Sequence, residues 1–279
     1  MTVLVTGATG NVGRPLVNQL ISEGARVRAL TRNTANHQLS FEADVVVGDP
    51  GHPDTIAEAL RDVTAVFLNP AAIGSVVQHV LDTARGRALS RVVLLSSFAV
   101  RDGGTQTTSI GAHHRQLEQA VEDSGLEWTF LRCGGFATNT LGWAPQIRNG
   151  GVVRGPYAHA VTAPIAEHDI AAATWALLDH GHVGKTYVLT GPESLTQIDQ
   201  LNLIGRAIGR QLHYEEIAPE VFRAAAVGHM RAEAVDDLLR YWAEYVDRTA
   251  EMSDDFRAIT REPPTTFAAW AKSHAHDFS

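Results

Sequence analysis

The sequence predicts an α/β fold of the Rossmann type, in which helices cover both faces of a doubly wound parallel sheet and a small C-terminal lobe serves the substrate. Three observations support this prediction. An apolar run at residues 2–5 is followed at once by a glycine-rich turn and by apolar residues at helical spacing. Strand and helix patterns then alternate through the first half of the chain. The 279 residues, of which 44% are hydrophobic, suffice for one large core.

The glycine-rich turn carries the first functional prediction. Gly7 lets the chain turn sharply out of the strand, and Gly13 lets the next helix pack closely on it. Gly10 removes a Cβ where a pyrophosphate would approach, and the helix N-terminus offers N–H groups to the phosphates. The strand before the turn and the helix after it are the context that a dinucleotide site requires. The alternative is a turn that binds nothing.

The second strand, residues 26–31, indicates which dinucleotide is bound. An NAD site usually places a carboxylate at the end of this strand, whereas this strand ends in Thr31 and Arg32. A guanidinium is permanently charged and suits a 2′-phosphate, and Arg14 could add a second cation. We therefore expect NADP(H) as the preferred cofactor, with NAD(H) as the alternative. Both arginines could instead be solvated surface residues.

The remaining elements follow from the same patterns. In the first half we expect strands at 44–48, 64–68, 91–95 and 126–132, and helices at 55–61, 75–85 and 109–124. Because these strands are apolar throughout, they indicate a parallel sheet covered on both faces. In the second half we expect helices at 139–146, 170–178, 196–208, 235–246 and 265–275, and strands at 150–156, 160–162, 185–190 and 211–217. We divide the chain into an NAD(P)-binding core, residues 1–135, and a smaller lobe, residues 136–279, interleaved with the core in one unit.

The site is expected at the carboxyl ends of the parallel strands, near the point where the strand order reverses. The residues at these strand ends are the candidate cofactor ligands: Gly7, Thr9, Gly10, Asn11, Val12, Arg32, Asp49, Leu68, Asn69, Pro70, Ser96, Ser97, Cys133, Gly134 and Phe136.

Composition excludes several classes of partner. The formal net charge is −8, which gives no support to nucleic-acid binding. The lone cysteine, Cys133, excludes an intrachain disulfide and favours a reducing compartment. Since we find neither a signal peptide nor an apolar run of membrane-spanning length, we expect a cytoplasmic protein without a membrane partner. The sequence leaves the oligomeric state open.

Several motifs together carry a family resemblance. They are residues 6–13, the pair His114-x-x-x-Glu118, and residues 123–132, 167–171, 187–195 and 264–267. With these motifs the chain resembles the NmrA-like group of atypical short-chain dehydrogenases, and most of all its NADPH quinone oxidoreductase and azoreductase-like members. The resemblance implies an NADPH-dependent oxidoreductase that transfers hydride to a small, quinone-like acceptor. It also implies that the strand ends hold the cofactor.

The chain departs from most short-chain dehydrogenases at one motif. These enzymes use a Tyr-x-x-x-Lys pair, and neither Lys185 nor Lys272 follows a tyrosine by four residues. Alcohol–ketone interconversion is therefore disfavoured, whereas a quinone needs less proton donation because its reduced oxyanion is a weak base. The resemblance nominates His114 as a hydrogen-bond donor to the developing charge. The alternative is that His114 only pairs with Glu118 one turn later.

Other interpretations remain beside the reductase. A non-catalytic NADP(H) sensor of the NmrA type is the main alternative, and a nucleotide-sugar isomerase ranks last because it usually needs the absent pair. We expect no metal site, because His114 and Glu118 lack a third ligand. Ser96 and Ser97 fit cofactor contact better than nucleophilic catalysis.

Five further side chains are assigned on weaker signals. Cys133 fits a crowded strand exit better than a redox thiol. Trp143 and Tyr157 could stack on a planar acceptor or pack the lobe. Asp236 and Asp237 are expected to be solvated surface charges.

Overall fold

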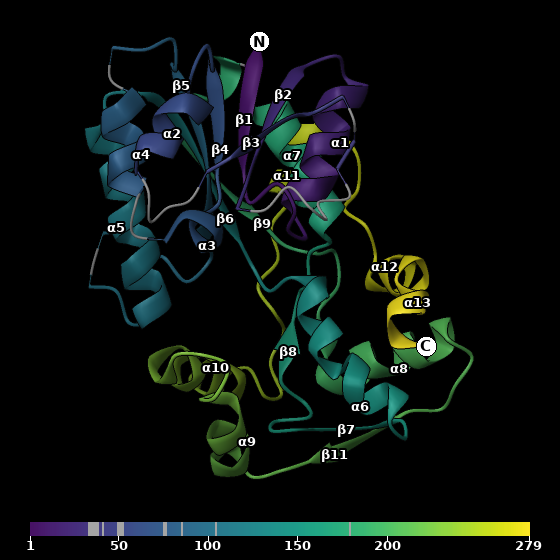
Figure 1. The fold of residues 1–279 in the computed structure, drawn as a ribbon. Helices are drawn as coiled ribbons and strands as arrows, with labels where there is room; N and C mark the ends of the chain where they lie inside the picture. The colour runs from purple at the N-terminus through teal and green to yellow at the C-terminus, as the bar shows by residue number, and fades with distance from the viewer. Residues whose placement is uncertain are drawn as a thin grey trace.

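A parallel sheet of seven strands forms the frame of the molecule (Figure 1). The computed structural model describes residues 1–32, 39–40, 42–48, 53–74, 77–84, 86–103, 105–178 and 180–279. Within these residues the strand order is β3-β2-β1-β4-β5-β6-β9. The strands are β1 (Thr2–Thr6), β2 (Arg26–Thr31), β3 (Asp44–Val47), β4 (Ala65–Leu68), β5 (Arg91–Ser97), β6 (Glu127–Cys133) and β9 (Lys185–Leu189). The order reverses between β1 and β4, which makes the ends of these two strands the switch point.

Helices cover both faces of this sheet, as predicted. Along β1, Val3 and Val5 join one core cluster and Leu4 joins the other, because successive side chains of a strand point to opposite faces. The helices of the first cluster are α1 (Gly13–Ser22), α7 (Glu167–Leu177) and α11 (Asp255–Thr260). Those of the second are α2 (Pro53–Ala59), α3 (Pro70–Ile73), α4 (Val77–Ala84) and α5 (Ser109–Asp123). Strand β9 and helices α7 and α11 lie beyond residue 135, so both halves of the chain build this layer.

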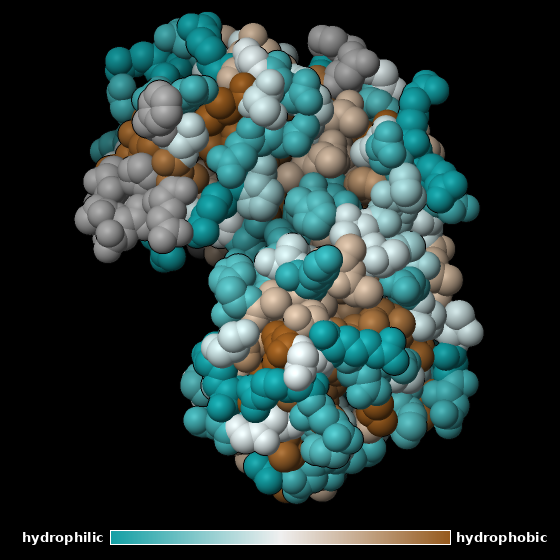
Figure 2. Space-filling model, turned by 90° about the vertical axis from the view of Figure 1, so that its right-hand side faces the viewer, coloured by the Kyte–Doolittle hydropathy of each residue, from teal (hydrophilic) through white to brown (hydrophobic). Residues whose placement is uncertain are grey.

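The lobe lies below the sheet layer in Figure 1 and has its own core around Trp270, Phe267 and Phe278. Its elements are η2 (Ala137–Trp143), α6 (Ala144–Arg148), β7 (Val152–Gly155), β8 (Val161–Thr162), β10 (Leu195–Thr196), α8 (Gln197–Ala207), β11 (His213–Glu216), α9 (Pro219–Ala226), α10 (Ala232–Glu244), α12 (Phe267–Ser273) and α13 (Ala275–Phe278). The 3₁₀ turn η3 (His180–His182) belongs instead to the sheet layer, between α7 and β9. Strand β7 pairs with β11 in parallel, and β8 pairs with β10 in antiparallel orientation. Figure 2 shows a waist in the surface between the sheet layer above and the lobe below.

The structure adds elements that the patterns did not predict. Helices α3, α9 and α11 span eight residues or fewer, too short for a clear apolar period. The helix expected at 139–146 is a 3₁₀ helix, η2, that continues into α6. Of the described helices, none combines the length and apolar character needed to cross a membrane.

Candidate functional site

The turn between β1 and α1 has the geometry that its glycines predict. Gly7 has φ +67°, a conformation that favours glycine. A Cβ on Gly13 would lie 2.1 Å from the carbonyl oxygen of Gly7, so only glycine fits where α1 crosses the strand end. The amide of Gly10 donates to the same carbonyl at 2.9 Å. These contacts close the turn on itself and leave Gly10 and Asn11 exposed.

The N-terminus of α1 is free to bind an anion. Val12 is its N-cap residue, no side chain caps the helix, and its first turn holds no acidic residue. The Arg14 amide donates to the Gly10 carbonyl oxygen at 3.0 Å, so a pyrophosphate would meet the N–H groups before Arg14 and the positive end of the helix dipole. Arg14 donates from Nη2 to the carbonyl oxygen of Thr9 at 3.0 Å, which holds its guanidinium over the turn.

A hollow at the ends of β1, β2 and β3 brings the turn together with Arg32. Its lining includes Gly7 and Thr9 from the turn, Arg32 after β2, and Gly48 after β3. The exposed Arg32 side chain therefore lies where the adenosine half of a dinucleotide would follow from the turn. Asp49, which we expected beside it, lies outside the described residues.

Helix α3 supplies a wall of this hollow that we did not predict. Ala72 and Ile73 complete the lining. The signal was present in the sequence, because Asn69 caps the helix through a 3.1 Å bond from the Ala71 amide and Pro70 occupies its first turn. The Asn69 amide donates to Thr6 Oγ1 at 2.7 Å, and this joins the exits of β1 and β4. Leu68 and Pro70 are buried, so neither side chain faces solvent at this exit.

The exits of β5 and β6 lie side by side in register. Ser97 pairs with Cys133, and the Phe98 amide donates to the Cys133 carbonyl oxygen at 2.9 Å. The Cys133 side chain is 4% exposed and burial raises the pKa of its thiol, which fits a packing role. The Gly134 amide donates to Leu189, and Phe136 bridges to Ile165. Strand β9 and the segment before α7 therefore fix the β6 exit.

The Ser96 side chain, near the end of β5, is hydrogen-bonded to a cluster of buried charged side chains. Its hydroxyl donates to Glu118 Oε1 at 2.6 Å. Glu118 is fully buried and also accepts from Arg132, at 2.9 and 2.8 Å, and from Arg115 at 3.1 Å. Arg132 in turn holds Asp102 through two bonds of 2.9 and 2.8 Å. Sequence reasoning named Glu118 and Arg132 only as parts of motifs and missed their contact.

His114 stands apart from this cluster, although it lies on the same helix one turn before Glu118. Its Nδ1 atom is buried and has no hydrogen-bond partner in the part of the chain that the structure describes, so this nitrogen does not bond Glu118. Burial, and then nearby His113, lower the pKa of His114 to about 4. The imidazole is therefore neutral near pH 7 and offers a hydrogen bond rather than a charge.

Two aromatic candidates lie in the lobe. Trp143 is half-buried and meets Tyr214 edge to face at 6.3 Å within the lobe core, which favours packing over stacking on an acceptor. Tyr157 has φ +52°, and its carbonyl oxygen accepts from Ala160 at 2.9 Å and from Gln197 at 3.0 Å. These bonds hold the backbone of Tyr157 in a left-handed conformation that residues other than glycine rarely adopt.

The prediction for Asp237 is wrong. The Asp236 side chain is 43% exposed and pairs with Arg223 at the surface, as expected, but Asp237 is 6% exposed and accepts hydrogen bonds from the start of α5. Its partners lie more than a hundred positions earlier in the chain, so no local pattern could have indicated them.

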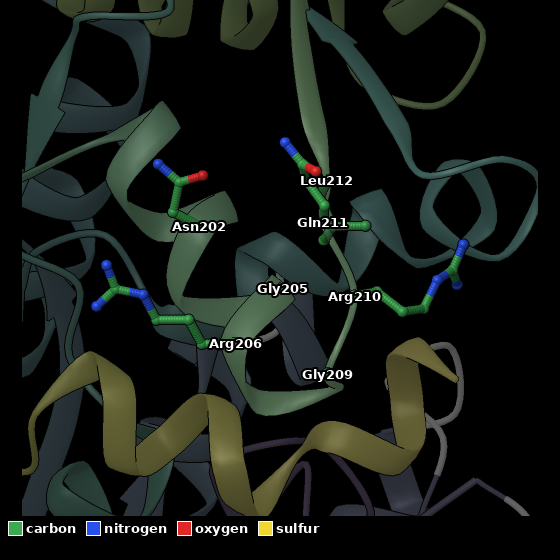
Figure 3. Close-up of a pocket in the computed structure, with 7 residues that line it drawn as sticks. All are labelled: Asn202, Gly205, Arg206, Gly209, Arg210, Gln211 and Leu212. Carbon is green, nitrogen blue, oxygen red and sulfur yellow. The ribbon is translucent and has the colours of Figure 1, made fainter.

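A larger hollow of about 500 Å³ opens on the lobe, far in the chain from the strand ends (Figure 3). It lies between the end of α8 and the start of β11, and the Arg206 and Arg210 side chains point away from each other at its rim. Arg206 belongs to the last turn of α8, where a cation complements the negative end of the helix dipole. The hollow shares no residue with the candidate site. A search of the described residues found no group of three side chains able to hold a metal ion.

The fold and the turn together define an α/β protein that binds a dinucleotide. A family model described as NAD(P)H-binding matches residues 7–181, and the chain belongs to this family. It is 34% identical to (4-alkanoyl-5-oxo-2,5-dihydrofuran-3-yl)methyl phosphate reductase of Streptomyces griseus, with 99% of both chains covered. It is 30% identical to NAD(P)H azoreductase of Xenophilus azovorans, again with 99% of both chains covered.

A solved structure has the same fold. The NADPH-dependent quinone oxidoreductase of Escherichia coli, solved with NADPH, superposes with a TM-score of 0.80 at 24% identity, covering 99% of this chain and 100% of that one. The predictions of a Rossmann-type fold, an NAD(P)H cofactor and an NAD(P)H-dependent oxidoreductase are confirmed. The individual site residues stay predictions.

Proposed function

We propose that this oxidoreductase uses NADPH to reduce a quinone or a similar planar, electron-poor acceptor. The observation that carries the proposal is the neutral, half-buried His114, whose Nδ1 has no partner among the described residues. Because Nδ1 itself is buried, the ring would donate to an acceptor oxygen from its other nitrogen, Nε2. The relatives named above are reductases of a quinone, an azo compound and an oxo-dihydrofuran, which supports an acceptor of this kind.

Two arginines support NADPH over NADH. Arg32 lies exposed at the tip of β2 beside the turn, in a hollow lined by Gly7 and Thr9. A guanidinium there would bind the 2′-phosphate through two parallel hydrogen bonds. Arg14 adds a positive charge beside the pyrophosphate.

Different residues of the chain would orient the cofactor and stabilise the charge on the acceptor. NADPH, when bound, supplies a hydride from its dihydronicotinamide ring. The glycine turn, the start of α1 and the exits of β4, β5 and β6 would orient the cofactor. His114, as a neutral imidazole, would donate a hydrogen bond to the acceptor oxygen that gains negative charge. Ser96 cannot take this role while its proton is held by Glu118.

The proton balance explains why no Tyr-x-x-x-Lys pair is needed. A reduced quinone oxyanion is a much weaker base than an alkoxide, so water can protonate it after hydride transfer. The chain then needs only to hold the acceptor against the cofactor and to stabilise the charge. We also propose a cytoplasmic location, which agrees with a single, buried, free thiol.

Acceptor-dependent oxidation of NADPH tests the proposal. We expect the wild-type chain to oxidise NADPH with menadione or benzoquinone, faster than NADH and faster than without an acceptor. His114→Ala should lower kcat by about 100-fold, the cost of removing one preorganised hydrogen-bond donor. His276→Ala, on a side chain that is 79% exposed near the C-terminus, is the control and should keep full activity. Tight NADPH binding without any acceptor-dependent oxidation would refute the reductase.

A further inference from the structure

The start of α5 is capped by a carboxylate from the lobe. Asp237 Oδ2, on α10, accepts from the Ser109 amide at 2.7 Å, from the Ser109 hydroxyl at 2.6 Å and from the Ile110 amide at 3.3 Å. The side chain of the helix's own N-cap, Thr108, accepts from the Gly111 amide at 2.9 Å. The side chain of Asp237 thus pairs N–H groups that would otherwise lack a helical partner, and its charge faces the positive end of the helix.

Asp237 is unusual for its helix. Only Val235 and Asp237 are buried among the residues of α10, which otherwise lies at the surface. A buried carboxylate is costly unless it is fully paired. Here the pairing is complete, because Oδ1 also contacts Arg240 at 3.2 Å and Arg240 reaches the Thr107 carbonyl oxygen at 3.1 Å. Asp237 and Arg240, both on α10, therefore hold the start of α5.

Helix α10 is anchored to the lobe at its other end. Tyr245, at its C-cap, is buried, and its carbonyl oxygen accepts from the Val161 amide of β8 at 3.1 Å. The next residue, Val246, bridges to Ala160. Figure 1 shows α10 below the lower end of α5, where that helix starts, and beside β8. The helix thus links the lobe to the helix that carries His114.

The distance from the cap to His114 is short. His114 lies five residues after Ser109, about 7.5 Å along the helix axis. A shift at the capped end would therefore be carried to His114 almost undiminished, because that segment is a single helix. A displacement of about 1 Å at a reacting group can cost about 100-fold in rate.

We propose that Asp237 is a positioning residue, which holds α5 from the lobe and so sets the place of His114 against the acceptor. This inference rests on the proposed function. Asp237 touches neither cofactor nor acceptor; it acts through α5. Through this contact, the position of the lobe relative to the sheet layer determines where His114 meets the acceptor.

Variants at two adjacent aspartates separate this role from general stability. Asp237→Ala should lower kcat/KM for menadione by about tenfold or more, while the Kd for NADPH stays within about twofold of wild type. Asp237→Asn keeps an accepting oxygen without the charge and should recover part of the loss. Asp236→Asn removes a partly exposed charge one residue away, which pairs with Arg223 instead of α5, and should change neither quantity. An unchanged kcat/KM in Asp237→Ala, or an equal loss of NADPH affinity, would overturn the proposal.

A second measurement does not depend on turnover. NMR titration of the His114 ring, assigned by its loss in His114→Gln, reports how well the ring is shielded beside His113 and Glu118. In Asp237→Ala the pKa of His114 should rise from about 4 toward 6.5, because water would reach a displaced ring. If the wild type oxidises no NADPH but this shift occurs, the reductase fails while the positioning contact stands. An unmoved pKa in a folded Asp237→Ala variant contradicts the positioning role.

Discussion

The Arg132 guanidinium grips both carboxylate oxygens of Glu118, through Nε at 2.9 Å and Nη2 at 2.8 Å, and the carboxylate is fully buried. Glu118 lies four residues after His114 on α5 and also accepts from Arg115 at 3.1 Å. Positive charge therefore reaches this carboxylate from β6, through Arg132, and from α5, through Arg115. The pair ties α5 to β6, and the Ser96 hydroxyl, which also donates to Glu118, ties α5 to β5.

Removing one partner of this pair should destabilise the fold strongly. Glu118→Gln leaves Arg132 buried beside an uncharged amide, and we expect the free energy of unfolding to fall by about 3–5 kcal/mol. Glu122→Gln, on the same helix but partly exposed, should cost about 1 kcal/mol or less. Urea unfolding of the two variants checks the difference, and equal losses would show that the buried pair has no special weight.

A methyl group at Gly13 should disrupt the glycine turn. The added Cβ would lie 2.1 Å from the Gly7 carbonyl oxygen, which is backbone and cannot rotate away. We expect Gly13→Ala to lower stability by about 1–3 kcal/mol or more and to abolish NADPH binding. Gly142→Ala is the control, since a Cβ there meets nothing within 4 Å and its φ is ordinary. Thermal unfolding with and without NADPH measures both effects; normal binding by Gly13→Ala would contradict the role of the turn.

Reversing the charge of Arg32 should change cofactor preference. Arg32→Glu should raise the Kd for NADPH by about tenfold or more, because a charged hydrogen bond contributes about 1.5–3 kcal/mol. The Kd for NADH, which has no 2′-phosphate, should change much less. Arg26→Glu, exposed at the opposite end of β2, should alter neither. Fluorescence titration gives the constants, and an NADPH affinity unaffected by Arg32→Glu removes this residue from the site.

Stability should depend on pH through His114. The folded pKa is lowered to about 4 from the ordinary 6.5, because burial disfavours the charged ring. Between these values the unfolded chain binds a proton that the folded chain does not. The free energy of unfolding should therefore fall by up to about 3 kcal/mol as the pH drops through this window. Urea titrations of wild type and His114→Gln give the difference; parallel pH curves for the two would exclude a shielded His114.

The patterns predicted the sheet layer well because its strands are continuously apolar and its helices have a clear period. They also predicted that the turn and Arg32 would come together, since strand ends of a parallel sheet share one edge. The cap of α5 by Asp237 could not be predicted, because it joins segments more than a hundred residues apart. Short helices such as α3 and α9 carry too few apolar positions to show a period, although Asn69 and Pro70 did mark the start of one.

The burial of Asp237 and the full pairing of Glu118 likewise depend on tertiary contacts, which the sequence patterns do not show. Both carboxylates look like helix-surface residues in the sequence, and only the elements packed against them make them buried and paired. The same reason explains His114: its place on α5 was visible, but its shielded Nδ1 was not.

Calorimetric titration of the wild-type chain with NADPH and NADH tests the central claim most directly, namely that the glycine turn and the arginine at the tip of β2 bind a phosphorylated dinucleotide. We predict saturable heat with both, and a lower Kd for NADPH. No heat with either dinucleotide, with protein fluorescence equally unchanged, would contradict the claim.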